Sequence, residues 1–127
     1  MNSQVNSLNW FEISVADLDR AKKFYETIFD ITMDVLNMME MDMASFPYDP
    51  AQQKVSGALV KSQYHKPSME GAKIYLNGNP DLDNVLSKIP GAGGSVVMPK
   101  TQISPEIGYM AFFIDTEGNN VALHSNA

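Results

Sequence analysis

The stretch FEISVADLDRAKKFY, residues 11–25, changes its hydrophobic period in the middle. Its first part alternates apolar and polar side chains, as a strand with one buried face does. Its second part repeats apolar side chains at helical spacing, and Asp17 stands just before them as a good N-cap. The stretch therefore predicts a strand over 8–15 that leads directly into a helix over 18–29.

The same order of elements recurs further along the chain. The other expected elements are strands over 31–36 and 39–46 around a turn at Asn37-Met38, strands over 55–61, 73–77, 95–99, 109–114 and 120–125, and a helix over 82–89. Two short matches support a repeat. Asp17-Leu18-Asp19 returns as Asp81-Leu82-Asp83, and Ala58-Leu59 returns as Ala122-Leu123, each 64 residues later. Together they indicate a duplicated βαβββ unit.

Residues 62–71 break every period and are interpreted as a connector. We therefore expect one domain over 1–127, with unit one at about 8–62 and unit two at about 72–127. A length of 127 residues suits a single domain.

The composition excludes several classes of protein. With 9 Lys+Arg against 15 Asp+Glu, the net charge is −6, which argues against nucleic acid as a partner. The absence of cysteine removes thiol chemistry and fits a reducing compartment. No apolar run approaches the ~20 residues that span a bilayer, and the N-terminus lacks signal-peptide features. We expect a cytoplasmic protein.

The run over 11–25, the ending Ala111–Asn119 and the pair Gly93-Gly94 resemble the vicinal oxygen chelate superfamily. This family includes glyoxalase I, extradiol dioxygenases and bleomycin-resistance proteins. The resemblance implies an α+β fold of two βαβββ units, each a curved mixed sheet with a helix outside, enclosing a cavity.

The alternation then predicts on which face of the sheet each side chain lies. The side chains expected to face the helices are Phe11, Ile13, Val15, Ile74, Leu76, Val121 and Leu123. The opposite side chains are expected to line the cavity. Among these, the candidate substrate-binding residues are Trp10, Glu12, Lys73, Tyr75, Asn77 and His124.

The resemblance also implies where a divalent metal would be held, at one position on each of four strands. Three of these positions fall on Trp10, Lys73 and Ala122, and the fourth falls on Ala58 or a direct neighbour, where Ser56, Gly57 and Leu59 offer no carboxylate or imidazole either. Indole, ammonium and methyl groups offer a cation no lone pair, so the sequence predicts no metal at these positions and no cofactor. A displaced site made of Glu12, His65 and His124 stays open, since nothing in the connector fixes the place of His65.

Glu12 is the best candidate for a catalytic residue. If Glu12 is buried, its carboxyl pKa is raised and the group suits a general base. If Glu12 lies beside Lys73, the two side chains form an ion pair that fills the metal position. We favour the ion pair. Met39, Met41 and Met43 are expected to share one strand face, as a core layer, a dimer contact or an adaptable ligand wall.

Three functions remain from the sequence. The first is a metal-independent protein, like bleomycin-resistance proteins, that binds a small, partly apolar organic molecule in the cavity. The second is a lyase, isomerase or dioxygenase of the glyoxalase type. The third is metal-free proton abstraction with Glu12 as the base. For each we expect a small-molecule ligand and a homodimer.

Overall fold

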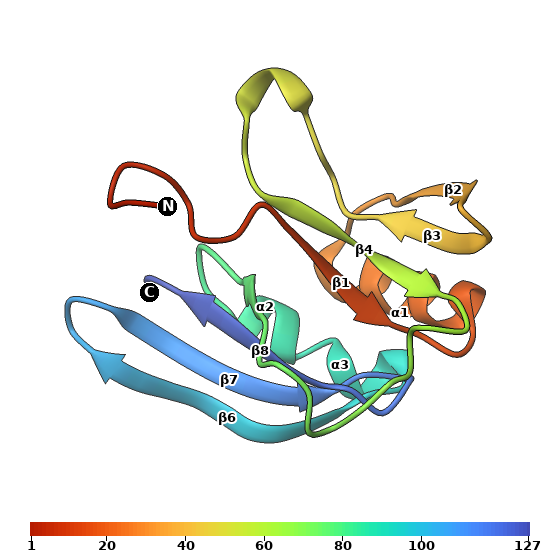
Figure 1. The fold of residues 1–127 in the computed structure, drawn as a ribbon. Helices are drawn as coiled ribbons and strands as arrows, with labels where there is room; N and C mark the ends of the chain where they lie inside the picture. The colour runs from red at the N-terminus through yellow and green to blue at the C-terminus, as the bar shows by residue number, and fades with distance from the viewer.

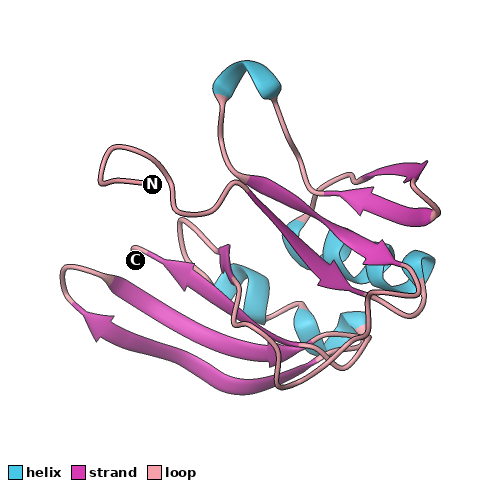
Figure 2. Cartoon of the chain, in the orientation of Figure 1, coloured by secondary structure: helices cyan, strands magenta, loops and turns pink.

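The computed structural model describes residues 1–127, and its helices and strands follow one order twice (Figures 1 and 2). Unit one contains β1 (Trp10–Ser14), α1 (Leu18–Phe29), β2 (Asp34–Met38), β3 (Met41–Ser45), a short 3-10 helix η1 (Pro50–Gln52) and β4 (Ser56–Lys61). Unit two contains β5 (Tyr75–Asn77), α2 (Asp83–Leu86), α3 (Ile89–Ala92), β6 (Ser95–Ser104), β7 (Gly108–Ile114) and β8 (Asn120–Ser125).

Each unit forms one four-stranded mixed sheet, and the two sheets have the same topology. The strand orders are β1-β4-β3-β2 and β5-β8-β7-β6, with the first pair in each sheet parallel and the others antiparallel. The sheets do not close into a barrel. The α+β class and the two mixed sheets expected from the sequence are confirmed.

Helix α1 begins and ends where the sequence predicts. The Asp17 side chain accepts a hydrogen bond from the Arg20 N–H at 3.0 Å, which satisfies one of the free donors of the first turn. Asp30 ends the helix in the left-handed region. The buried side of the helix is made of Leu18, Ala21, Phe24, Tyr25 and Ile28.

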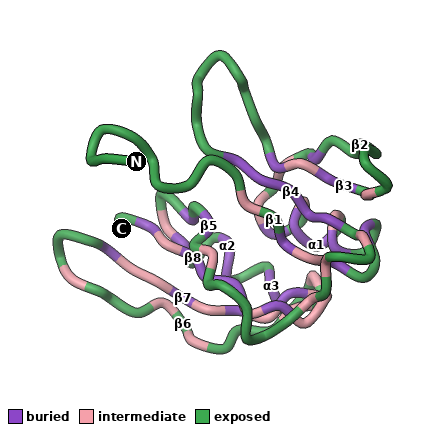
Figure 3. Tube along the Cα trace, viewed as in Figure 1, coloured by how far each residue is buried: buried purple, intermediate pink, exposed green.

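The helices of the two units pack against one another, since α1 contacts both α2 and α3 (Figure 1). One core of 20 buried residues joins the helices to the inward-facing side chains of both sheets, and Figure 3 shows much of the buried chain there. The side chains expected to face the helices do so. Ile13, Val15, Leu76, Val121 and Leu123 are buried in this core, and Phe11 and Ile74 pack against it. The other face of each sheet, called its outer face below, points away from the shared core.

The hairpin of unit one turns later than predicted. Met39 and Glu40 adopt positive φ angles of 54° and 61°, so they form the turn in place of Asn37-Met38. The Asn37 amide donates to the Asp42 carboxylate across the hairpin, which keeps Asn37 inside the ladder. Met39 therefore does not share a strand face with Met41 and Met43 as expected, and it is 84% exposed.

The helix of unit two is also different from the prediction, since it breaks into α2 and α3. Pro90 lies in the first turn of α3, where its missing N–H costs nothing, and the chain restarts a helix there. Gly93, with φ of 106°, ends α3. Strand β5 is shorter than predicted and β6 is longer.

A turn of unit two, between β7 and β8, holds the start of α1 in unit one. The Glu117 carboxylate accepts hydrogen bonds from the Ala16 and Asp17 N–H groups at 2.9 and 2.8 Å and from two Arg20 nitrogens at 2.7 and 3.0 Å. Burial opposes ionisation of Glu117, yet the hydrogen bonds from Arg20 and the two backbone groups outweigh it and lower its pKa to about 2.

The same turn reaches the buried side of α1. The Tyr25 hydroxyl donates to Asp115 Oδ2 at 2.7 Å, and the Asn119 amide donates to both Asp115 and the Ser14 carbonyl. Burial, followed by the Asp115 charge, raises the pKa of Tyr25 well above its ordinary value. We call these contacts of Arg20, Tyr25, Asp115, Glu117 and Asn119 the locked joint. They tie unit two to unit one.

Candidate functional site

A groove of about 1120 Å³ lies between β1 and β5, each of which is an edge strand of its sheet. Of its 24 lining residues, 13 are hydrophobic, which is the composition of a site for a partly apolar molecule. Its walls come from both units: the ends of α1, β3 and β4 in unit one, and β5 and α2 in unit two.

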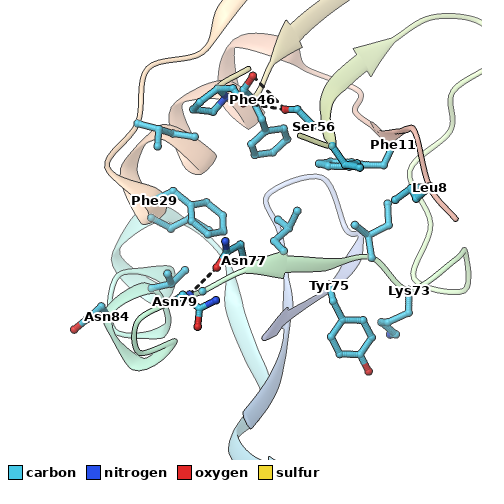
Figure 4. Close-up of a pocket in the computed structure, with 18 of the residues that line it drawn as sticks. Leu8, Phe11, Phe29, Phe46, Ser56, Lys73, Tyr75, Asn77, Asn79 and Asn84 are labelled. Atoms are coloured by element: carbon cyan, nitrogen blue, oxygen red, sulfur yellow. Dashed lines mark hydrogen bonds between the residues drawn. The ribbon is translucent and has the colours of Figure 1, made fainter. Parts of the chain in front are cut away.

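Three phenylalanine rings form the apolar wall. Phe11 of β1, Phe29 of α1 and Phe46, which directly follows β3, belong to unit one, and Figure 4 shows them on the same side of β5. The Phe11 and Phe46 rings are 5.5 Å apart. Residues of unit two bring three amides to the lining, those of Asn77, Asn79 and Asn84. The groove can therefore hold an aromatic body and hydrogen-bond its polar end.

Gly57 makes the position of the Phe11 ring possible. It pairs with Phe11 across the β1–β4 ladder, and a Cβ added there would lie 2.5 Å from the ring. No real side chain tolerates such a contact. Glycine inside this strand therefore lets the ring lie against the β4 backbone and leaves space for the groove.

The structure brings five of the six predicted binding residues to this groove. Trp10, Glu12, Lys73, Tyr75 and Asn77 line it. His124 does not, because it lies on β8 with its Nε2 atom 2.7 Å from the Ile107 carbonyl oxygen. The predicted binding role of all six residues stays a prediction.

Lys73 and Tyr75 lie near an aromatic residue of unit two. The Lys73 ammonium is 4.8 Å from the centre of the Phe112 ring, and the Tyr75 ring meets the same ring edge-on at 6.3 Å. Figure 4 shows both side chains on the side of β5 away from the phenylalanines. The expected ion pair between Glu12 and Lys73 is wrong, because Glu12 has another partner.

That partner is His65 of the connector. His65 Nε2 lies 2.8 Å from Glu12 Oε1, and His65 Nδ1 lies 2.6 Å from Ser62 Oγ. A carboxylate only accepts hydrogen bonds, so His65 Nε2 carries the proton. In the neutral ring, Nδ1 then accepts from the Ser62 hydroxyl. Trp10 Nε1 donates to the other Glu12 oxygen at 3.4 Å.

The residues at the four metal positions do not fit a divalent cation. The Trp10 nitrogen is a donor, Lys73 lies over a ring, and Ala58 and Ala122 present buried methyl groups. The displaced set of Glu12, His65 and His124 does not assemble either, and no three His, Asp or Glu side chains lie close enough to hold an ion.

The sequence reasoning missed Ser62 and His65 as a pair, and it missed Phe29 and Phe46 as groove walls. The spacing Ser-x-x-His directly after a strand was a usable signal, since residues at i and i+3 of a tight turn come close. No comparable signal marks Phe29 and Phe46, which belong to the helical stripe and the strand pattern of the core.

The chain belongs to the Glyoxalase/Bleomycin resistance protein/Dioxygenase superfamily, whose family model matches residues 7–123. It is 26% identical over 121 residues to a glyoxylase-like domain-containing protein from Didymella fabae, and the match covers 91% of each chain. No helix of the chain is both long and apolar enough to cross a membrane.

Solved structures share this fold. TnmS3, an antibiotic binding protein from Streptomyces sp. CB03234, matches with a TM-score of 0.65 and 22% identity, covering 99% of this chain and 100% of that one. A glyoxalase I mutant from Zea mays matches with a TM-score of 0.71 and 19% identity, covering 92% of this chain and 45% of that one. At these identities the likeness establishes the fold alone.

Proposed function

We propose that this protein binds a small, partly apolar organic molecule in the groove between β1 and β5, without the help of a metal ion. The groove itself is the observation that supports this function. It combines three phenylalanine rings with amide groups, and it lies beside positions where the metal-using relatives hold their ion but where this chain has Trp10, Lys73 and two alanines. The fold shared with TnmS3 is consistent with a binding role.

A titration with Nile red, a neutral aromatic dye that fluoresces in apolar surroundings, tests the binding role. We expect saturable binding that a chelator leaves unchanged and that Phe29→Ala weakens about tenfold, since it removes one wall of the groove. Val97→Ala is the matched control, because Val97 is 53% exposed and lies outside the groove. Equal affinity in the wild type and Phe29→Ala would refute this site.

The alternatives receive less support from the geometry. A glyoxalase-type isomerase or dioxygenase needs a metal that the four positions do not suit. Proton abstraction by Glu12 would compete with the hydrogen bonds that its two oxygens accept from His65 at 2.8 Å and Trp10 at 3.4 Å. The geometry therefore favours a holding role for Glu12 over a role as base.

Two further expectations belong to this proposal. Apolar side chains on the outer face of sheet one, such as Leu36 and Met38, are 37% and 51% exposed, which supports pairing of two copies. Sedimentation velocity tests this homodimer. Absence of cysteine supports a cytoplasmic location, which microscopy of the tagged protein tests.

A further inference from the structure

We infer that Ser62, His65 and Glu12 form a hydrolytic site for small esters with an apolar acyl group. The site borders the binding groove: Glu12 lines that groove, whereas Ser62 and His65 do not. Ser62 would be the nucleophile, His65 the base and Glu12 the positioning residue. The inference does not depend on the proposed binding function.

The order of the three groups carries the inference. A hydroxyl, an imidazole and a carboxylate lie in one hydrogen-bonded line, with 2.6 Å from Ser62 Oγ to His65 Nδ1 and 2.8 Å from His65 Nε2 to Glu12 Oε1. A nucleophile within reach of a base, whose other nitrogen is held by a third group, is the arrangement that activates a serine.

The surrounding backbone holds this line in place. The His65 N–H donates to the Ser62 carbonyl at 3.3 Å and closes a tight turn at the end of β4. The Tyr64 N–H donates to Ser62 Oγ at 3.0 Å, which fixes the hydroxyl oxygen beside the imidazole. The His65 side chain is 16% exposed, which limits its contact with water while the neighbouring Ser62 stays partly exposed.

The preference for an apolar acyl group follows from the neighbouring strands. Lys61, the residue before Ser62, pairs with Asp42 in the last step of the β3–β4 ladder, and Met41 is the neighbour of Asp42 at that end of β3. Met41 pairs with the half-exposed Met38 of β2. Methionine side chains adapt to apolar groups of varied shape, so they suit a short acyl chain.

The chemical step balances without any co-reactant other than water. Ser62 Oγ bonds to the ester carbonyl carbon while its proton moves to His65 Nδ1. The carbon–oxygen bond to the alcohol then breaks, and the alcohol leaves with that proton. Water attacks the acyl-serine with His65 again as base, which releases the carboxylic acid and restores Ser62.

Hydrolysis of para-nitrophenyl butyrate, together with labelling by a fluorophosphonate, tests the site. We expect the label on Ser62, identified by peptide mass spectrometry, and a loss of turnover of about 100-fold or more in Ser62→Ala and in His65→Gln. Ser68→Ala, in the same connector, should hydrolyse the ester at the wild-type rate. Circular dichroism of each variant checks that it is folded.

Glu12 needs a readout that a merely structural role would not change. In the wild type, nitrogen NMR should show the His65 proton on Nε2. In Glu12→Gln the side-chain amide donates to Nε2 instead, so the proton should move to Nδ1 and turnover should fall. The chain has two histidines, which keeps the spectrum simple.

The inference is overturned if the label appears on another residue or on none, or if Ser62→Ala hydrolyses the ester as fast as the wild type. Each of these outcomes leaves the Nile red result untouched, because the dye reports on the groove. Loss of dye binding with intact ester hydrolysis would overturn the proposed function instead.

Discussion

The duplicated units meet at two equivalent joints, and these joints differ. At the locked joint, the β7–β8 turn of unit two contacts the start of α1 through Asp115, Glu117 and Asn119. At the other joint, which we call the open joint, the long β3–β4 connection of unit one faces the start of α2 across the groove. Three residues of that connection line the groove, namely Phe46, Pro47 and Val55.

The difference shows how a duplicated fold separates stability from binding. Asp17 and Asp81 occupy the same place in the repeat, but the helix after Asp17 meets Glu117 of the other unit, whereas Asp81 pairs with Lys100 of its own unit at 2.9 Å. Since the locked joint already connects the units, the open joint is free to keep a groove.

The largest expected effect is at Glu117. Glu117→Gln should lower the free energy of unfolding at neutral pH by about 2–3 kcal/mol, because the carboxylate has a depressed pKa of about 2 and its side chain is fully covered. This stabilisation is complete above the ordinary pKa of 4.5 and is lost as the pH falls toward about 2.

Urea unfolding at several pH values measures this effect. The wild type should lose stability between about pH 4.5 and 2, and the variant should lose less over the same range. The exposed Glu106→Gln is the control. Equal unfolding free energies for Glu117→Gln and the wild type at neutral pH would contradict the joint as described.

The next effect is at the buried end of the same joint. Tyr25→Phe removes the hydroxyl that donates to Asp115 and leaves a buried carboxylate with one donor fewer, so we expect a loss of about 1.5–3 kcal/mol. Tyr64→Phe makes the same chemical change at an 83% exposed site and should have no effect on stability. Affinity for Nile red should stay unchanged in both variants, and a weaker affinity in Tyr25→Phe would show that the joints are coupled.

A smaller effect is expected at the open joint. Asn84→Phe places a bulky ring in the groove from α2, so Nile red affinity should fall about tenfold, equivalent to about 1.4 kcal/mol, with little change in stability. Ser87→Phe, on the same helical turn and outside the groove lining, should bind as the wild type does. Equal affinities for the two variants would place the dye elsewhere.

The smallest effect concerns the ion pair of the open joint. The Lys100 ammonium lowers the pKa of Asp81, but both side chains are partly exposed, and such pairs contribute little. Lys100→Ala should therefore change the melting temperature by about 1 °C or less. A drop as large as that of Glu117→Gln would show that the open joint also carries stability.

Much of the fold could be predicted from the sequence because its signals are local. The cap at Asp17 and the buried stripe of α1 gave the helix its correct ends, and alternation gave the strands their correct faces. The hairpin turn was misplaced because two non-glycine residues, Met39 and Glu40, adopt positive φ, which residue type rarely reveals.

The site was harder to predict for a physical reason. Alternation placed Glu12 and Lys73 on corresponding strand faces, but the partner of Glu12 is decided by a connector without any period. The path of that connector depends on tertiary contacts, such as the hydrogen bond from the Ser68 N–H to the Asn119 amide oxygen at 2.9 Å. The place of His65 follows from such contacts and from the turn at Ser62.

The groove depends on glycine at position 57, which has a hydrogen atom where any other residue has a Cβ. At position 57 the strand has no side chain, and the aromatic ring of its neighbour occupies that vacancy. A Cβ there would meet the Phe11 carbonyl oxygen as well as the ring, so Gly57→Ala would push both the β1 backbone and its ring away from β4 and reshape the groove.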